Sequence, residues 1–491
     1  MRCAGRLMLL AVVVAGCASS SRSPANASGA TAASGTGAAG TVADTTILTA
    51  APAVNSSAAT TLAGATSGAP PAASAGPGEW LSFDGDLDHR GRVAAGPDPT
   101  SVSVRWRSPA LDGDVYGQAL VHNDTVFVAT EGDSVVSMSA SDGHLIWTTN
   151  LGRPVAQSTL PCGNIDPTGI TSTPVIDAAG TTLYVVTFTQ PGQHQLVAVD
   201  VASGTVRWRH AIDPPGLNPL VEQQRSALAL ANGRVYVAFG GLYGDCGPYK
   251  GAVVSFAADG SGDTSSWIVP TAREGGIWAP SGLAIDAAGN LYAATGNAAS
   301  TDNNHFDYGN AVVRLTPDLK LADYWASTDW AALSSSDSDL GSQGPLLIGD
   351  NRVFVAGKAG IGYVLDATNL GHIGGEVSHL PICDRAFGAS ATDGTSLVVA
   401  CENGVSAVTV ASDGTMHAVW KAGGDRGGPP VIAGETVWIS AANGHTRALD
   451  LASGHLLADV SVASKLNGFP GTTVTPNAIY VTGTNVVTMI A

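Results

Sequence analysis

Ala198-Val-Asp200-Val-Ala-Ser203-Gly204-Thr-Val-Arg-Trp208 is a strand, turn, strand phrase that decides the fold of this chain. Apolar residues alternate along both arms, so one face of each strand is predicted to lie in a core. Asp200 and Ser203 can bond the amides of the turn, and Gly204 tolerates a positive φ. The closing tryptophan offers a broad apolar face to a neighbouring unit.

Weaker copies of this phrase recur to the end of the chain, which indicates a repeat architecture rather than a series of unrelated domains. The copies span residues 137–147, 255–267, 313–325, 407–420 and 448–458. Reading each unit as four antiparallel strands predicts an all-β chain that forms an eight-bladed β-propeller. The inner strands are expected near Ala119, Thr173, Ala227, Gly282, Gly344, Gly388, Gly428 and Gly471.

The two ends of the repeat array complete one another. The last unit stops after its third strand, at 486–490, whereas 102–108, with Trp106, looks like an outer strand without a blade. Pairing these two segments closes a ring and hides edge strands that would otherwise promote aggregation. The alternative architecture, a β-sandwich or an open solenoid, leaves the mismatch between the ends unexplained.

The first 78 residues are predicted to export and tether the chain. Residues 1–17 have an export-signal pattern, with a basic start, the apolar run 7–14 and then Val14-Ala15-Gly16-Cys17. That quartet resembles the bacterial lipoprotein box, which implies a lipid on Cys17; an ordinary secretory signal is the alternative. Residues 18–78 are almost all Ala, Ser, Thr, Gly and Pro, the composition of a disordered tether. The propeller is then expected over 79–491, lipid-anchored to the outer face of a bacterial cell membrane.

Charge and cysteines restrict the partners and the compartment. A net charge of −17 argues against nucleic acid and leaves the lipid as the only expected membrane contact. Four further cysteines are predicted to form two disulfides, Cys162 with Cys246 and Cys383 with Cys401, because an even number is typical of exported chains. Four isolated buried thiols are the alternative. All four lie in polar insertions predicted at one end of the ring, where they surround a common mouth.

Four local phrases resemble the quinoprotein β-propellers, in particular the alcohol dehydrogenases that depend on pyrroloquinoline quinone (PQQ). They are Trp80-Leu-Ser-Phe-Asp-Gly-Asp, Gly275-Gly-Ile-Trp278 with 286–297 ending in Thr-Gly-Asn, Asp337-Ser-Asp339, and 358–369 with Tyr363-Val-Leu-Asp366. The resemblance covers about residues 80–491. The repeats alone also resemble non-catalytic scaffolds of outer-membrane assembly.

The resemblance implies a site for PQQ and Ca²⁺. Trp278 would be the indole floor under the quinone, since stacking needs a broad aromatic face. Asn297 and Asp339, with Asp245, would supply oxygen ligands to Ca²⁺. Asp339 or Asp337 would be the general base, and Lys358 would place positive charge near the quinone or lower the pKa of the acid. Each residue also has an ordinary role, as a packing, turn-forming or solvated side chain.

Three departures from the dehydrogenase pattern weaken the implied site. The calcium-binding glutamate aligns with Cys246, which leaves only the shorter Asp245 beside it. The vicinal disulfide that covers the quinone is missing, because the neighbours of Cys162 are Pro161 and Gly163. The glutamate expected before Gln118 is replaced by Tyr116 or Gly117.

Three functions remain open. The first is a module that binds a small ligand or an envelope protein at the propeller mouth, with a degenerate cofactor site. The second is a PQQ- and calcium-dependent dehydrogenase that oxidises an alcohol or sugar and passes electrons to a separate acceptor. The third is an envelope assembly scaffold. Fold resemblance does not choose among them, because unrelated functions share one fold.

Overall fold

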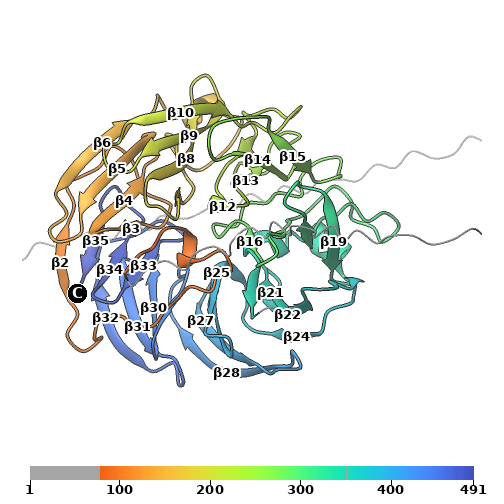
Figure 1. The fold of residues 1–491 in the computed structure, drawn as a ribbon. Helices are drawn as coiled ribbons and strands as arrows, with labels where there is room; N and C mark the ends of the chain where they lie inside the picture. The colour runs from red at the N-terminus through yellow and green to blue at the C-terminus, as the bar shows by residue number, and fades with distance from the viewer. Residues whose placement is uncertain (1–77, 350) are drawn as a thin grey trace, which may run out of the picture. The chain divides into compact units, whose positions relative to one another are not determined.

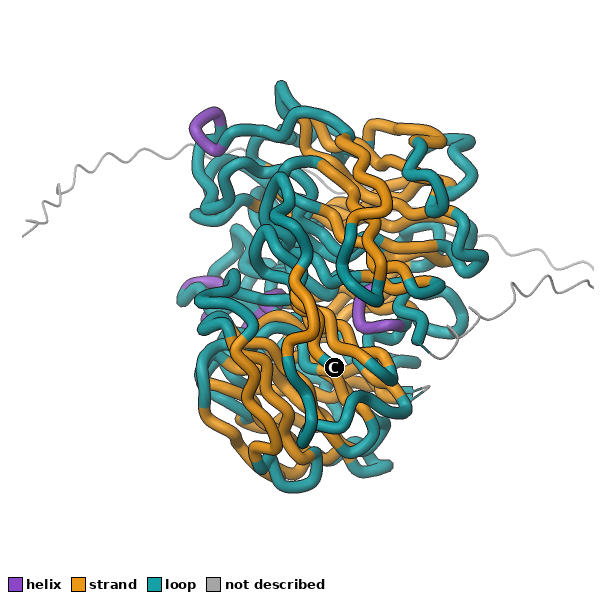
Figure 2. The backbone as a smooth tube through the Cα atoms, turned by 90° about the vertical axis from the view of Figure 1, so that its left-hand side faces the viewer, coloured by secondary structure: helices purple, strands orange, loops and turns teal. Residues whose placement is uncertain are grey.

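The computed structural model describes residues 78–349 and 351–491. The predicted export signal, the lipidated Cys17 and nearly all of the predicted tether lie outside this range. Within it the chain is built from strands, with one α-helix, α1 (Trp330–Ser335), and three short 3-10 turns, η1 (Phe83–Gly85), η2 (Gln157–Thr159) and η3 (Leu340–Ser342). Figure 2 shows this strand framework with loops at both rims.

Eight antiparallel sheets form a ring of blades, as the repeats predicted (Figure 1). From the inside outward, blades 1 to 4 are β3 (Leu120–His122), β4 (Thr125–Ala129), β5 (Ser134–Ser139), β6 (Leu145–Asn150); β7 (Val175–Ile176), β8 (Thr182–Thr189), β9 (Gln193–Asp200), β10 (Val206–Ala211); β12 (Ala229–Ala231), β13 (Arg234–Gly241), β14 (Ala252–Ala257), β15 (Ser265–Ile268); and β16 (Ala284–Ile285), β17 (Leu291–Ala294), β18 (Ala311–Leu315), β19 (Leu321–Ala326).

Blades 5 to 8 continue the same order: β20 (Leu346–Ile348), β21 (Arg352–Ala356), β22 (Ile361–Asp366), β24 (Ser378–Pro381); β25 (Ala386–Thr392), β26 (Ser396–Cys401), β27 (Gly404–Val410), β28 (Met416–Gly423); β29 (Val431–Ala433), β30 (Thr436–Ala441), β31 (His445–Asp450), β32 (Leu456–Ser461); and β33 (Thr472–Thr475), β34 (Ala478–Val481), β35 (Thr488–Ile490) with β2 (Val104–Arg107). Three short strands add to blades 7, 3 and 4: β1 (Arg92–Val93), β11 (Glu222–Gln223) and β23 (His372–Ile373).

The ring closes through β2, which is the outer strand of blade 8, as predicted. Val104 pairs with Ile490 and Arg107 with Thr488, so residues nearly 400 positions apart share a ladder. In Figure 1 the orange β2 lies beside the blue β35. The sandwich and the open solenoid are therefore excluded.

Tryptophans of the repeat join neighbouring blades. The Trp147 indole of blade 1 donates to the Val201 carbonyl of blade 2 at 3.2 Å, and Trp420 of blade 6 donates to Leu451 of blade 7 at 2.8 Å. Trp106 makes the same contact across the closure, to Ala140 at 3.0 Å. A Cβ on the turn glycine beneath each indole would clash, at 2.5–2.6 Å from ring atoms. The tryptophan of one repeat thus packs against the turn glycine of the next, and each contact needs both residues.

The segment that precedes the ring, 80–91, runs along the inner strands at one end. Its backbone bonds to blades 1, 2, 4, 5, 6 and 7, through contacts such as Trp80 N to Val121 O at 2.8 Å and Ile432 N to Gly91 O at 2.8 Å. Asp84 is fully buried there and exchanges hydrogen bonds with Gln118, each 2.8 Å long. The orange segment at the centre of Figure 1 therefore ties the blades together from inside.

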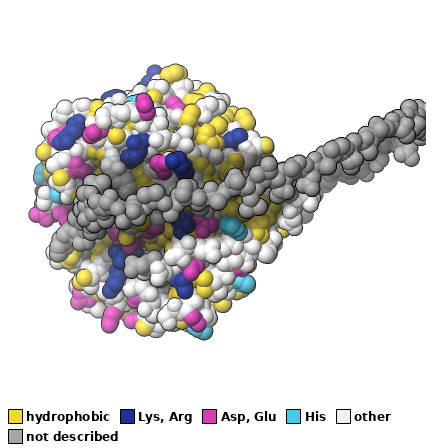
Figure 3. All heavy atoms as spheres, turned by 45° about the vertical axis from the view of Figure 1, so that its right-hand side comes forward, with side chains coloured by type: hydrophobic (Ala, Val, Ile, Leu, Met, Phe, Trp, Pro, Cys, Tyr) yellow, Lys and Arg dark blue, Asp and Glu magenta, His cyan; other side chains and the backbone are white. Residues whose placement is uncertain are grey.

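On the face shown in Figure 3, basic and acidic side chains are interspersed, so no large area carries charge of one sign. No helix within the described part of the chain is long and apolar enough to cross a membrane. Two disulfides, Cys162–Cys246 and Cys383–Cys401, join the pairs that the sequence predicted. The first links the β6–β7 connection to the β13–β14 loop, and both are typical of proteins outside the reducing cytoplasm.

Candidate functional site

The residues singled out in the sequence come from blades 4 and 5 and meet at one end of the ring. Trp278 lies in the segment leading into β16, Asn297 follows β17, and Lys358 lies between β21 and β22. Asp337 and Asp339 lie between α1 and η3. In a propeller the connections into an inner strand and those between the second and third strands share one end, and this geometry brings the five together.

Lys358 lies between the two aspartates. Its Nζ is 2.5 Å from Asp339 Oδ2 and 2.8 Å from Asp337 Oδ1. Asp339 and Lys358 are mostly buried, with 8% and 15% of their side chains exposed, whereas Asp337 is 69% exposed. The Lys358 amide also donates to the Asp339 carbonyl at 2.8 Å. Two carboxylates thus bind one ammonium. The backbone hydrogen bond holds Lys358 and Asp339 side by side.

Asn297 connects the two aspartates from the other side. Its backbone N–H donates to Asp339 Oδ1 at 2.7 Å, and its side-chain amide donates to Asp337 Oδ1 at 3.1 Å. Its side-chain oxygen, Oδ1, accepts from Asn310 Nδ2 at 3.1 Å. A Cβ on Gly296 would lie 2.7 Å from Asp339 Oδ1 and 3.2 Å from the Trp278 indole nitrogen. Glycine is therefore needed for the carboxylate and the indole to approach this backbone.

The electrostatics of the three ionisable groups follow from their unequal burial. Burial raises the pKa of Asp339, although the charge of Lys358 opposes the rise. For Asp337 slight burial is outweighed by the hydrogen bond and the charge of Lys358, and its pKa is lowered. Burial also works against the Lys358 ammonium, but Asp339 and Asp337 raise its pKa above the usual value. Lys358 is consequently a firmly held cation.

This arrangement does not fit a calcium ion. Ca²⁺ takes six to eight oxygen ligands, yet the ammonium of Lys358 occupies the position beside Asp339 Oδ2. Asp245 does not complete a set, because it is exposed and accepts from Tyr249 at 2.7 Å, and Cys246 is bonded to Cys162. Among the residues described, no group of three or more His, Cys, Asp or Glu side chains has the arrangement of a metal site.

Among the residues that the dehydrogenase resemblance implies, Trp278 agrees best with its expected role, the indole floor under a flat ligand. It is half-buried, and Lys358 Nζ lies 5.9 Å from the centroid of its ring. A Cβ on Gly240 or Gly276 would lie within 3 Å of Trp278 atoms, so the indole is wedged against backbone. Part of its surface stays open beside a cation, which suits a flat anionic ligand as well as a quinone.

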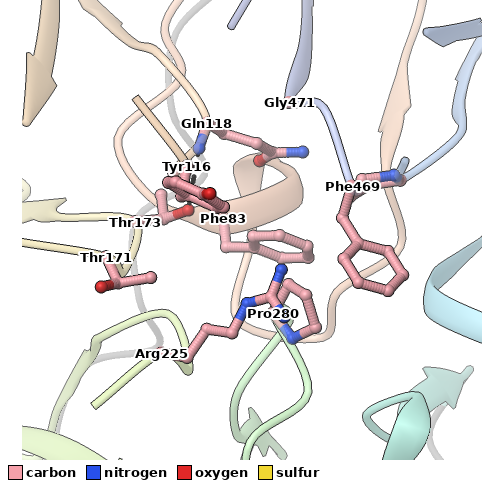
Figure 4. Close-up of a pocket in the computed structure, with 11 residues that line it drawn as sticks. Phe83, Tyr116, Gln118, Thr171, Thr173, Arg225, Pro280, Phe469 and Gly471 are labelled. Carbon is pink, nitrogen blue, oxygen red and sulfur yellow. Dashed lines mark hydrogen bonds between the residues drawn. The ribbon is translucent and has the colours of Figure 1, made fainter. Parts of the chain in front are cut away.

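A narrow pocket lies nearby on the inner strands (Figure 4). It is lined by Phe83, Tyr116, Gly117, Gln118, Thr171, Thr173, Arg225, Pro280, Pro429, Phe469 and Gly471. These residues come from the starts of the inner strands of several blades and from the N-terminal segment. In Figure 4 the Arg225 side chain extends toward Phe469.

Sequence analysis missed Arg225 and three buried acids. Glu131, Asp133 and Glu222 are at most 2% exposed, and each has one carboxylate oxygen without a hydrogen-bond partner. Burial raises their pKa values to about 7, about 8 and about 8. Arg225 precedes an inner strand, so its position alone could have placed it near the axis. The burial of the three acids could not be predicted from the sequence, because it depends on contacts between blades.

Comparisons with known proteins agree with this fold. Residues 89–305 match the family model described as outer membrane protein assembly factor BamB, a PQQ-type repeat. No protein in the curated set matches the chain. Among solved structures, the quinohemoprotein alcohol dehydrogenase ADHIIG of Pseudomonas putida HK5 has a TM-score of 0.66 at 15% identity, over 84% of this chain and 80% of that one.

Two further structures show how widely this fold is used. A europium-containing methanol dehydrogenase has a TM-score of 0.64 at 14% identity, over 83% of this chain and 91% of that one. BamB from Moraxella catarrhalis has a TM-score of 0.55 at 16% identity, over 79% and 99%. The predicted resemblance is confirmed: residues 89–305 match a PQQ-repeat family model, and the whole ring has the β-propeller fold of the quinoprotein dehydrogenases. Its fold is that of dehydrogenases and of assembly factors alike.

Proposed function

We propose that this protein is an exported, lipid-anchored propeller that binds a small ligand or a protein segment at its mouth, with a cofactor site that no longer serves calcium-dependent quinone chemistry. The observation that carries the proposal is the position of Lys358 between Asp337 and Asp339. A lysine within 2.5 Å of the carboxylate takes the position that a metal would need.

The electrostatic argument is direct. Adding Ca²⁺ beside Asp339 would place two positive centres within a few ångströms of each other in a largely buried site, where charge repulsion is weakly screened. Only displacement of the Lys358 ammonium relieves that repulsion, and displacement would leave a mostly buried cation without its partners. The position that aligns with the calcium-binding glutamate is Cys246, which has no carboxylate and is bonded to Cys162.

The convergence of Trp278, Asn297, Asp339 and Lys358 is the observation that favours the second candidate, a PQQ-dependent dehydrogenase of alcohols or sugars. Lys358 contacts Asp339 and Trp278, and the Asn297 amide donates to Asp339, which supports the site that the dehydrogenase resemblance implies. The similarity to BamB supports the protein-binding version of the first candidate, in which a partner segment occupies the mouth. The dehydrogenase and the protein-binding propeller each predict measurements that differ from those expected for a module that binds a small ligand.

The deciding experiment adds PQQ and Ca²⁺ to the purified protein and records the absorbance of bound quinone and dye-linked oxidation of alcohols and sugars. We expect no calcium-dependent chromophore and no turnover. Lys358→Met tests the reason: removing the ammonium should increase calcium affinity at Asp339, measured by calorimetry. Lys320→Met is the matched control, since Lys320 pairs with Asp318 at an exposed site. Turnover in the unmodified protein that Lys358→Met abolishes would establish the dehydrogenase instead.

A further inference from the structure

We propose that Arg225, which lines the axial pocket, and Arg426, which lies over the same Phe469 ring, form an anion site that binds the carboxylate of a small aromatic acid. This inference rests on the proposed ligand-binding function and names the class of ligand. It uses residues of blades 3, 7 and 8, separate from the Lys358 cluster of blades 4 and 5.

Arg225 reaches the pocket from the segment leading into β12. Its Cζ lies 4.7 Å from the centroid of the Phe469 ring, which comes from the segment leading into β33. Blades 3 and 8 are not neighbours, so the side chain spans the axial region of the ring (Figure 4). Within residues 78–349 and 351–491, Arg225 has no ion pair and donates no hydrogen bond to a protein group. Its guanidinium therefore keeps its donors free.

Arg426 approaches the same ring from blade 7. Its Cζ lies 5.2 Å from the centroid of Phe469 and 5.7 Å from that of Phe387. Its Nε is buried and has no hydrogen-bond partner among the described residues. A buried N–H donor without an acceptor costs about 1–3 kcal/mol. Two guanidinium groups on one aromatic ring, neither paired with an acid, are an arrangement that an anion would stabilise.

Glu131, the acid whose charge acts on Arg225, neutralises it only in part. Burial raises the pKa of Glu131 to about 7, so near neutral pH much of it carries no charge. One of its oxygens already accepts from the Gly169 amide at 2.6 Å. Burial lowers the pKa of Arg225 to about 10; Tyr116 and Glu131 oppose this shift and Arg426 adds to it. The positive charge at the pocket is thus shared by two arginines and is left without a matching carboxylate.

The shape of the pocket selects the ligand. The pocket itself has room for little more than a water-sized group, such as one carboxylate oxygen, and Phe83, Pro280, Pro429 and Phe469 give it apolar walls. A guanidinium fork matches a planar carboxylate with two parallel hydrogen bonds. A flat ring attached to that carboxylate would lie on the aromatic wall at the rim. The chemistry therefore favours an aromatic carboxylate over a bulky tetrahedral phosphate.

Arg385 provides a matched control from the same mouth. Its Cζ lies 5.8 Å from the Phe387 centroid, but its guanidinium is paired with Glu402 at 3.8 Å, whereas Arg225 and Arg426 have no ion pair among the described residues. Arg385→Met removes an arginine that, like Arg426, follows an aspartate in the sequence, and it leaves the proposed carboxylate site complete.

The test is calorimetric titration of the full chain with isophthalate, without quinone or calcium. We expect one site, at least tenfold weaker binding in Arg225→Met and in Arg426→Met, and less than a twofold change in Arg385→Met. The neutral isophthalamide should bind at least tenfold more weakly than isophthalate. If Arg225→Met does not fold, as judged by circular dichroism, Arg426→Met decides.

Equal binding of isophthalate by both arginine variants and the unmodified chain would overturn the site, as would equal binding of isophthalamide. Inorganic phosphate that binds as tightly as isophthalate would overturn the aromatic class. Because calcium and PQQ are absent, these outcomes are independent of the test of the proposed function. Calcium-dependent turnover with a normal isophthalate site would reject only the latter.

Discussion

Replacing Glu222 by glutamine should make the protein more stable at neutral pH and leave it unchanged in acid. Glu222 is fully buried, and one of its oxygens accepts from the Lys250 amide at 3.1 Å. Its other oxygen has no hydrogen-bond partner. Burial, with a smaller effect of Asp213, raises its pKa from 4.5 to about 8. Glutamine keeps the acceptor for Lys250 and cannot ionise.

The magnitude follows from proton linkage. Between pH 4.5 and about 8 the folded chain holds a proton on Glu222 that the unfolded chain has lost. Stability therefore falls as pH rises through this window, by about 1.4 kcal/mol per pH unit. At pH 7 the penalty is about 3 kcal/mol, which the glutamine variant does not have. At about 2.1 cal/mol/K per residue, a ring of this size would melt about 3–4 °C higher.

The assay is scanning calorimetry of the unmodified chain and Glu222→Gln at several pH values from 4 to 8. The two melting temperatures should coincide near pH 4 and separate steadily up to pH 8, apart from any constant offset due to the amide. Glu435→Gln, at an exposed position, should show no such separation. A difference between Glu222→Gln and the unmodified chain that stays constant across the range would refute the reasoning.

Three further outcomes are expected. Trp106→Ala should destabilise the ring by about 3 kcal/mol, since it removes the indole that joins blade 8 to blade 1. Trp106→Phe should cost less. Equal urea midpoints for the two variants would contradict the role given to the Trp106 indole in joining the blades. Cys162→Ser with Cys246→Ser opens a loop with a sequence separation of 84 and should cost about 4 kcal/mol of unfolding free energy; an unchanged urea midpoint would contradict this. Cys17→Ala should abolish partitioning into the detergent phase, and identical partitioning of both proteins would exclude the lipid anchor.

Much of the fold could be predicted from the sequence because the repeat is a local property. Alternation along strands and turn residues such as Asp200, Ser203 and Gly204 act within one hairpin, so they are readable in a single copy. The eight inner strands lie within a few residues of the predicted positions. Closure was also predictable, since an incomplete last blade and an orphan strand with Trp106 leave one arrangement that satisfies both.

The candidate site was only partly predictable. Strand direction and the family resemblance place Trp278, Asn297, Asp339 and Lys358 at one end of the ring. They do not say which partner Lys358 takes, because that depends on distances between loops of two blades. The assignment of Asp245 and Asn297 to a calcium ion is a sequence-based expectation that these distances argue against.

The sequence by itself determined the class of fold, the number of blades, the closing strand and the end of the ring where the polar loops gather, because short-range patterns encode all of these. Only the tertiary structure decided that Arg225 and Arg426 share the Phe469 ring, that Glu222 is buried without a charge partner, and that Lys358 lies between two aspartates. These features depend on the exclusion of water and on ångström-scale distances between blades far apart in the chain. No single stretch of residues carries that information.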